Sequence, residues 1–388
     1  MAGGAAGGAA GGAAGGAAGG AAGGAAGGAA GAGFPVTLSD QFSSTLVVDA
    51  LVRSRDGIAE FTTAPLSPMA QSPDIARWDG WVRTFLGVQA LLEGLHFEVS
   101  ALPLPSKRPT TKELVAIATA QEAREATLWY ASSKASTRVV KIKRPPATVF
   151  EHQIYKVLDW AELRGERASE VLAQIDNQNA FWGAIVPFHT GRMRKTADLV
   201  EAVTQFVVFI EARFKHEFGC WRPTELSPQV QPMITTPGHG AFPSGHCTQS
   251  YAIAHLLGRL VGVTRGDERD IQLQRLAARI AMNRVVAGVH FPVDNLVGRL
   301  LGQCLGEYAL ARMIPTKPPN CTPRFFDGAA AGLAGLDFRP TDQALDPSAA
   351  KAPMCYRPLG NSFGRAAGSP LLEQLWQGAF DECAYLRP

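Results

Sequence analysis

Long segments with the apolar spacing of amphipathic helices follow one another along most of this chain, and they constrain its fold more than any other feature. Apolar residues that recur every three or four positions form one stripe on a helix, and that stripe must be buried against another element. The pattern is strongest over 196–218, where Leu199, Val203, Phe206 and Phe214 share one face. Strand signals are few. We therefore expect an all-α fold built from helical bundles.

Capping residues and glycines set the expected ends of these helices. Thr110 and Glu113 form a capping box, and Gly219 and Gly288 follow periodic segments as helix stops. From Pro315 on, the chain is rich in Pro, Gly and Ala and predicts a loop-rich tail that wraps the bundle or a neighbouring subunit. The expected helices are 110–130, 150–177 (one helix or two), 196–218, 244–263, 268–287 and 292–313, with a short one near 371–380.

The first part of the chain has a composition unlike the rest. Residues 2–31 repeat Ala-Gly-Gly-Ala with a period of four and have no large apolar side chain to pack, so burial cannot offset the entropy of ordering them. We interpret 1–33 as a disordered or artificial leader and 34–388 as one helical domain. The leader lacks the basic start and apolar core of a signal peptide. The sequence is compatible with a cytoplasmic or a secreted protein.

Charge, cysteines and hydropathy exclude several classes of protein. The net charge of +3 gives no sign of a nucleic-acid partner. The six cysteines are scattered without a C-x-x-C pair, which argues against a zinc ribbon or a small disulfide scaffold. The longest apolar run outside the leader, 202–210, is far shorter than the roughly twenty residues of a bilayer-spanning helix. We therefore expect a soluble chain that has no membrane partner.

Three short motifs within 215–294 place polar side chains at expected helix ends. They are KHEFGCWRP, with Lys215 and Arg222; PSGH, with Ser244, Gly245 and His246; and NRVVAGVHFPVD, with Arg284, His290 and Asp294. The helix that begins at Ser244 exposes unpaired backbone amides and the positive end of its dipole. Arg and Lys supply charge-assisted donors for tetrahedral oxyanions. If a bundle brings these helix ends together, they predict a cradle for a phosphate-sized oxyanion with an acid–base histidine beside it.

Each of these residues also has an ordinary structural interpretation. Ser244 can be only a helix cap, and Lys215 only a solvated helix end. His290 can be a buried histidine whose hydrogen bonds are satisfied, and Asp294 can merely favour a helix N-terminus. The ordered set favours function, because every member of it falls at a helix end.

The motifs resemble the signature K-x6-R-P, P-S-G-H, S-R-x5-H-x3-D of a known superfamily. That superfamily joins type 2 phosphatidic acid phosphatases, bacterial acid phosphatases and vanadium-dependent haloperoxidases. The match covers Lys215 to Asp294, and its one departure is Asn283, where phosphatases usually have Ser. The resemblance implies the helical bundle of the haloperoxidase and acid phosphatase type for most of the chain.

The resemblance also implies a role for each residue. The oxyanion cradle is assigned to Lys215, Arg222, Ser244, Gly245 and Arg284. His246 becomes the acid–base residue. His290 becomes the group that bonds the central atom, and Asp294 orients it.

Two chemistries use such a cradle. In a haloperoxidase, vanadate occupies it with His290 as the ligand of the metal, His246 takes a proton from hydrogen peroxide, Lys215 polarises the peroxide, and halide is oxidised without haem or flavin. In a phosphatase, His290 attacks phosphorus and His246 protonates the leaving alkoxide. A third possibility is a degenerate member that serves as a scaffold, although every signature residue except the Ser replaced by Asn283 is present.

Several features favour the peroxidase. The chain carries no bilayer-spanning run, it is long for a soluble acid phosphatase, and Trp221 and Asn283 give its motifs a haloperoxidase-like form. His239 lies five residues before Ser244, as a histidine does in algal bromoperoxidases, which points to bromide; it can also be a plain loop histidine. The implied partners are hydrogen peroxide, a halide and a small organic substrate. By resemblance alone, we expect a homo-oligomer.

Overall fold

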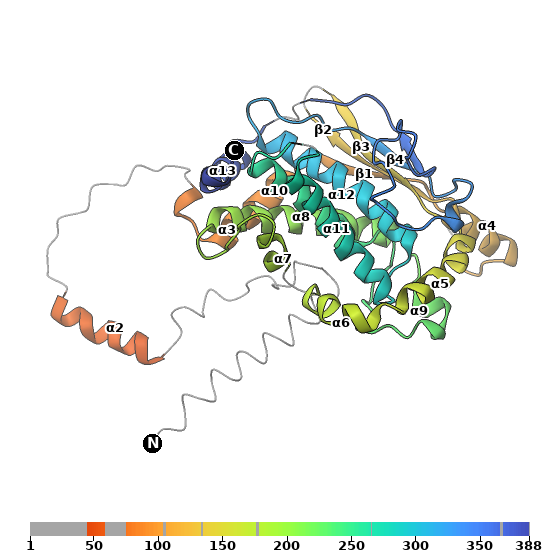
Figure 1. Cartoon of the computed structure of the whole chain (residues 1–388), viewed down its shortest axis with the longest axis horizontal. Helices are drawn as coiled ribbons and strands as arrows, with labels where there is room; N and C mark the ends of the chain where they lie inside the picture. Colours follow the sequence, from red (N-terminus) through yellow and green to blue (C-terminus); the bar gives the residue numbers. More distant parts are fainter. Residues whose placement is uncertain are drawn as a thin grey trace, which may run out of the picture.

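A computed structural model describes residues 45–58, 75–103, 106–132, 135–175, 178–264, 266–364 and 368–387. The expected leader, 1–33, lies outside these ranges. As predicted, the described chain is mostly helical, and one small sheet lies along one side of the helices (Figure 1).

Four long helices form the centre of the bundle and carry the motifs. Helix α10 packs against α8, α11 and α12. Nearly every side chain of α12 is buried, which places this helix in the interior. A Cβ atom at Gly298 would lie 2.9 Å from the carbonyl oxygen of Ser244, so this glycine lets α12 approach the start of α10 closely. The four helices are α8 (Arg194–Phe218), α10 (Gly245–Leu260), α11 (Glu268–Val286) and α12 (Pro292–Met313).

The remaining helices are shorter. Helices α3 and α13 pack on α8, and α5 and α6 pack on α11, so the expected segment 150–177 is two helices. They are α2 (Thr45–Ile58), α3 (Gly80–Leu92), α4 (Thr111–Glu122), α5 (Ala147–Ala161), α6 (Arg164–Ala173), α7 (Asn179–Gly183), α9 (Pro223–Leu226) and α13 (Pro370–Glu382), with 3-10 turns at Ile75–Arg77, Pro228–Val230, Leu333–Gly335 and Ala384–Leu386.

A five-stranded sheet adds to the predicted bundle. Its strands are β1 (Leu95–Val99), β2 (Glu125–Ala131), β3 (Ser136–Lys143), β4 (Arg324–Phe326) and β5 (Tyr356–Pro358), in that order across the sheet. Strands β3 and β4 are parallel, and the other pairs are antiparallel. The C-terminal tail therefore does wrap the bundle, since it supplies two strands of the sheet.

The expectation that one helix reaches Tyr130 is wrong. The capping box at Thr110 is present, but helix α4 ends at Glu122 and the chain continues into β2. Ala126, Leu128 and Tyr130 are buried at every second position, which is the spacing of a strand. Pairing on both sides, with β1 and β3, completes the backbone hydrogen bonds of this segment.

The sheet also supports the PSGH motif. The ring of Phe326 in β4 lies 5.7 Å from that of Phe242, and the ring of Phe242 lies 5.5 Å from that of Phe218 at the end of α8. Aromatic pairs at such separations contribute about 0.5–1.5 kcal/mol beyond the area they bury. The segment before Ser244 is thus held between the sheet and the end of α8.

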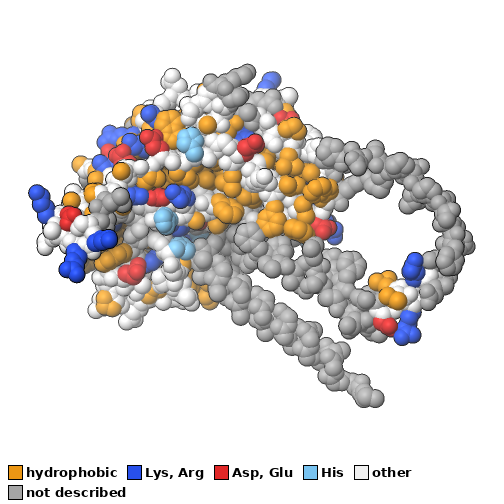
Figure 2. Space-filling model, turned by 180° about the vertical axis from the view of Figure 1, so that it is seen from behind, with side chains coloured by type: hydrophobic (Ala, Val, Ile, Leu, Met, Phe, Trp, Pro, Cys, Tyr) orange, Lys and Arg blue, Asp and Glu red, His pale blue; other side chains and the backbone are white. Residues whose placement is uncertain are grey.

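The surface shows which residues face solvent. Hydrophobic side chains cover much of the middle of the face drawn in Figure 2, and Lys and Arg gather toward one end. All six cysteines fall within the described ranges, where they are buried and form no disulfide. Among the helices described, none is both long and apolar enough to span a bilayer.

Candidate active site

One buried pocket gathers the motif residues at the ends of the long helices. The end of α8, the start of α10 and the connection between α11 and α12 meet there, together with the end of α6. Its lining consists of Ile175, Glu211, Lys215, Arg222, Ile234, Pro237, His239, Gly245, His246, Arg284, Val289 and His290. Ser244 and Asp294 are fully buried beside it. The structure therefore brings all the predicted site residues together.

Two glycines follow the ends of α8 and α11, as predicted. Gly219 has a φ of 54° and closes α8 with a 3.0 Å bond from its N–H to the carbonyl of Lys215. Gly288, with a φ of 80°, follows the end of α11. Only glycine adopts this left-handed conformation without strain. These two turns direct Arg222 and His290 back into the pocket.

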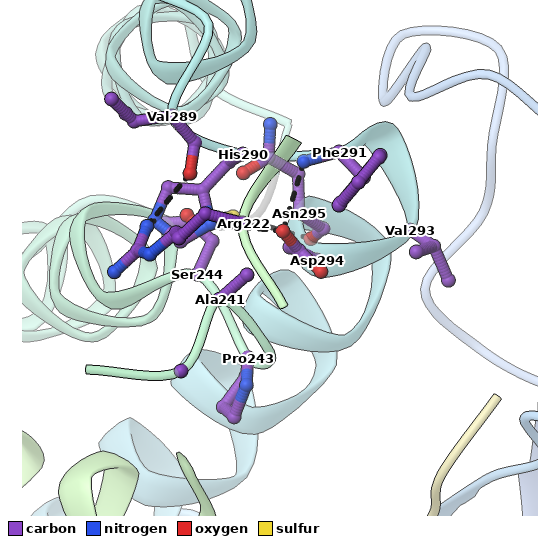
Figure 3. Close-up of polar contacts among 12 residues, drawn as sticks. Arg222, Ala241, Pro243, Ser244, Val289, His290, Phe291, Val293, Asp294 and Asn295 are labelled. Atoms are coloured by element: carbon purple, nitrogen blue, oxygen red, sulfur yellow. Dashed lines mark hydrogen bonds and ion pairs between the residues drawn. The ribbon is translucent and has the colours of Figure 1, made fainter. Parts of the chain in front are cut away.

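Arg222 is held in the wall of the pocket by its neighbours. Its Nη1 donates to the carbonyl of Val289 at 2.7 Å and to Nε2 of His290 at 3.0 Å, as Figure 3 shows. Its Nε donates to the carbonyl of His239 at 3.0 Å, and its Nη2 to Nδ1 of His239 at 3.1 Å. Burial lowers the pKa of Arg222 to about 10, which leaves it charged at neutral pH. His239, expected as either a site residue or a plain loop histidine, thus lies in direct contact with Arg222 of the cradle.

Lys215 reaches the pocket from the last turn of α8. Its Nζ donates to the carbonyl oxygen of Pro243 and lies 3.4 Å from that of Gly240. Burial lowers the pKa of this ammonium to about 8, against the opposing effect of Glu211. Lys215 therefore fixes the segment before the PSGH motif as well as adding positive charge.

Arg284 is the second guanidinium of the pocket. Its Nη2 donates to the carbonyl of Val171 at 3.0 Å, in the last turn of α6. Its Nε and Nη1 are buried and have no partner among the described residues. A buried donor without a partner costs about 1–3 kcal/mol, so these two atoms call for an acceptor in the pocket.

The start of α10 supplies further donors. Ser244 occupies the N-cap position, yet its side chain makes no capping bond. Its Oγ is buried and has no partner in the described part of the chain. The interpretation of Ser244 as a mere helix cap therefore does not fit the geometry. The first amides of α10, from Gly245 on, are free of intrahelical partners and suit an anion.

His290 and Asp294 form a buried pair. Nδ1 of His290 donates to Oδ2 of Asp294 at 3.0 Å, and the same oxygen accepts the Phe291 N–H at 2.9 Å (Figure 3). The carboxylate thus holds the proton on Nδ1, so Nε2 carries the lone pair. Burial, followed by the neighbouring charge of Arg222, lowers the pKa of His290 well below its usual range.

His246 is fixed in one tautomer by the end of α6. Its Nε2 lies 3.0 Å from the carbonyl oxygen of Gln174. Because a carbonyl only accepts, Nε2 carries the proton and Nδ1 is the ring's acceptor. Burial, and then the charge of Arg284, lowers the pKa of His246 well below its usual range, so the ring is neutral.

Two residues of this site escaped the sequence reasoning. The side chain of Gln174 accepts a 2.8 Å bond from Asn283, so the residue that departs from the signature helps to hold the partner of His246. Glu211 lies one helical turn before Lys215 and lines the pocket, fully buried. The only signal for Glu211 was its spacing from Lys215, because residues four apart share a helix face.

The donor set fits a tetrahedral oxyanion, whether phosphate or vanadate. Two guanidiniums, one ammonium and a helix N-terminus face one small pocket. Three of their buried donor atoms have no partner within the described ranges: Ser244 Oγ, Arg284 Nε and Arg284 Nη1. Nε2 of His290, which accepts from Arg222, carries a lone pair at the wall of this pocket. No group of three or more His, Cys, Asp or Glu side chains suited to a metal cation occurs in the described residues.

Comparison with known proteins finds similarity in the segment that carries this site. Residues 198–316 match the model of the PAP2 superfamily. This PAP2 segment contains most of α8, all of α10, α11 and α12, and all the predicted site residues.

Two relatives of the PAP2 segment differ in chemistry. A vanadium-dependent bromoperoxidase from Ascophyllum nodosum is 28% identical over 114 residues, which are 23% of this chain and 20% of the relative. A decaprenylphosphoryl-5-phosphoribose phosphatase from Mycobacterium tuberculosis is 34% identical over 79 residues, 20% of this chain and 41% of the relative. The chain thus matches less than half the length of either relative. These similarities support an enzyme of the phosphatase and haloperoxidase type and favour neither activity.

Proposed function

We propose that the pocket binds vanadate and that the chain is a vanadate-dependent haloperoxidase. In this reaction hydrogen peroxide takes two electrons from a halide, and halide, peroxide and a proton give hypohalous acid and water. The hypohalous acid equivalent then halogenates a small organic substrate. The observation that carries the proposal is the neutral His246, whose Nδ1 is left as an acceptor at the pocket.

The cradle residues would hold the vanadate. Nε2 of His290 would be its one protein ligand, and Arg222, Arg284, Lys215 and the Ser244–Gly245 backbone would surround its oxygens. When bound, pentavalent vanadium acts as a Lewis acid that activates peroxide, and neither haem nor flavin is needed.

His246 suits the task of taking a proton from peroxide. A general base must be unprotonated at the working pH and must have its lone pair directed at the substrate. The carbonyl of Gln174 meets the second condition by holding the Nε2 proton, and burial meets the first by lowering the pKa. A phosphatase instead needs this ring protonated, so that it can give a proton to the leaving alkoxide.

We propose further roles for His239 and for the apolar surface. His239 contacts Arg222 at the pocket wall, where it would tune the bound peroxide or the halide, and the likeness to a bromoperoxidase supports bromide. The apolar area in Figure 2 supports a homo-oligomer, since such areas are often interfaces.

Phosphate monoester hydrolysis is the second candidate. The Nε2 lone pair of His290, oriented through Asp294, suits in-line attack on phosphorus with formation of a phosphohistidine. Similarity to a phosphatase supports it as well. In this reaction His246 would have to gain a proton on binding the dianionic ester.

One experiment separates the two activities. Purified protein is incubated with vanadate and assayed for bound vanadium by elemental analysis and for bromination of a phenol dye with bromide and peroxide. We expect about one vanadium per chain, and bromination that requires it. Phosphate should inhibit the loading of vanadate, because both ions share one geometry. Rapid hydrolysis of phosphate esters by vanadate-free protein, with no bromination after loading, would instead establish the phosphatase.

A further inference from the structure

Glu211 is an acid in a pocket built for an anion. It extends from α8 one turn before Lys215, is 1% exposed and lines the pocket together with Arg222 and His246. None of the three sequence motifs includes it. A carboxylate next to an oxyanion would repel it, so its presence needs a chemical reason.

The contacts of Glu211 leave one oxygen for a guest. Its Oε1 accepts a bond from Nε2 of Gln249 at 3.1 Å. Its Oε2 is buried and has no hydrogen-bond partner among the described residues. The carboxyl group lies directly against Gly245: a Cβ atom there would be 2.5 Å from Oε1 and 3.3 Å from Oε2. Glu211 therefore adjoins the amide end of α10, where the oxyanion is expected.

The missing partner of Oε2 must be a donor. A carboxylate oxygen only accepts hydrogen bonds. The cations, Ser244 and the first amides of α10 around the expected oxyanion are donors, and another acceptor at the pocket is Nδ1 of His246. An oxyanion that carries a hydroxyl can donate its proton to Oε2 while its remaining oxygens accept from the cations. An oxyanion without a proton would place a lone pair against the carboxylate, and the buried oxygen would stay unpaired.

We propose that Glu211 makes the cradle selective for tetrahedral oxyanions that carry their own proton. Hydrogen phosphate and hydrogen vanadate meet this condition at neutral pH, and sulfate does not. The inference rests on the proposed binding of an oxyanion in this pocket, but it holds for either of the two activities.

The charges around Glu211 set the pH range of the selectivity. Lys215 on the same helix and Arg222 after it stabilise the carboxylate, and Gln249 on α10 donates to it. His246, Arg284 and His290 face the same pocket from the other elements. Burial is the largest effect and raises the pKa of Glu211 to about 7. Above that pH the carboxylate requires a donor, and below it a protonated Glu211 can itself donate to sulfate.

The test compares two ions of equal charge. Inorganic phosphate at about pH 8.5 is mostly the dianion with one hydroxyl, whereas sulfate is a dianion with none. Calorimetric titration of the full chain with each ion should show phosphate bound at least about tenfold more tightly at this pH, the ratio that an unpaired buried acceptor predicts. At about pH 5.5 the ratio should shrink for two reasons, because Glu211 takes up a proton and phosphate becomes a monoanion while sulfate stays a dianion.

A variant and a matched control assign the effect to this residue. Glu211→Gln keeps the shape but supplies an amide donor, so at about pH 8.5 sulfate should bind at least about tenfold more tightly than it binds to the unaltered chain, and the preference for phosphate should be lost. Glu201→Gln changes another glutamate of α8, outside the pocket lining, and should leave the ratio as it is. If Glu211→Gln does not fold, the phosphate-to-sulfate ratio of the unaltered chain at about pH 8.5, where the two ions have equal charge, decides alone.

The outcomes separate this inference from the proposed function. Equal binding of phosphate and sulfate by the unaltered chain at high pH overturns the role of Glu211 and leaves the oxyanion site intact. Unchanged selectivity in Glu211→Gln overturns it too. If neither phosphate, sulfate nor vanadate binds, the proposed oxyanion site itself is wrong.

Discussion

The guanidinium of Arg222 donates to Nε2 of His290 at 3.0 Å, while Nδ1 of the same ring donates to Asp294 at 3.0 Å. Both ring nitrogens are therefore engaged, and the lone pair is directed at the cationic side of the pocket. An oxyanion whose central atom bonds to Nε2 must displace the Arg222 N–H from this lone pair. The same event releases a donor of Arg222 for the oxygens of the guest, so capture of the central atom and of its oxygens is coupled.

Asp294→Asn should disable His290 while leaving its position nearly unchanged. The amide can donate to Nδ1, which moves the ring proton to Nε2 and removes the lone pair that faces the pocket. We expect vanadate affinity to fall about 10–100-fold and turnover by up to about 10⁴-fold. Affinity is measured by competition with phosphate, and circular dichroism checks the fold. Affinity and turnover like those of the unaltered chain would show that the pair does not orient the ring.

Substitution of the two histidines should separate binding from turnover. His290→Ala removes the single proposed ligand and should abolish the retention of vanadium after gel filtration. His246→Ala should keep most of the vanadium, because the cations remain, but lose about 10²–10⁴-fold in bromination rate. Elemental analysis and the dye assay on the same samples give both quantities. Equal loss of vanadium in the two variants would contradict the separate roles.

The sequence predicted most helices of the bundle and the residues that the structure gathers at one pocket, because both depend on local signals. The apolar stripe of 196–218, the stops at Gly219 and Gly288 and the spacing of the three motifs can all be read without the fold. The sheet was missed for a physical reason. Strands β4 and β5 are short segments of the tail, and they are defined by pairing with distant residues rather than by their own composition.

Some contacts of the site also depend on residues that are distant in the sequence, so local signals could not predict them. The carbonyl groups of Val171 and Gln174 hold Arg284 and His246, but every residue has a carbonyl, and only the packing of α6 on α11 brings these two to the pocket. Glu211 was hidden because a glutamate on an amphipathic helix ordinarily faces water. Its burial follows from the close approach of α8 and α10 at Gly245.

The charge of Lys215 should govern the alkaline limit of oxyanion binding. Burial lowers its pKa to about 8, and only the protonated form attracts an anion. Phosphate affinity should therefore fall as the pH rises above about 8, with a limiting slope of about tenfold per pH unit.

Lys215→Met should bind phosphate more weakly, and its affinity should be flat between about pH 8 and 9.5. Lys195→Met, at an exposed position near the start of α8, serves as the control and should keep the slope. A slope that persists in Lys215→Met would assign the titration to another group.

Gly245→Ala should disrupt the site through a single methyl group. The added Cβ would lie 2.5 Å from Oε1 of Glu211, well inside contact distance, so either α10 or the glutamate must move. We expect a loss of about 1–3 kcal/mol in the free energy of unfolding and a clear loss of phosphate affinity, because the displaced amide end of α10 no longer fits the oxyanion.

Gly165→Ala in α6 is the matched control, since its Cβ would meet no atom within 4 Å. There, alanine should stabilise the helix by about 0.5–1 kcal/mol and leave phosphate binding unchanged. Chemical denaturation and phosphate titration of both variants measure the two effects. Unaltered binding in Gly245→Ala would mean that neither the start of α10 nor Glu211 adjoins the oxyanion.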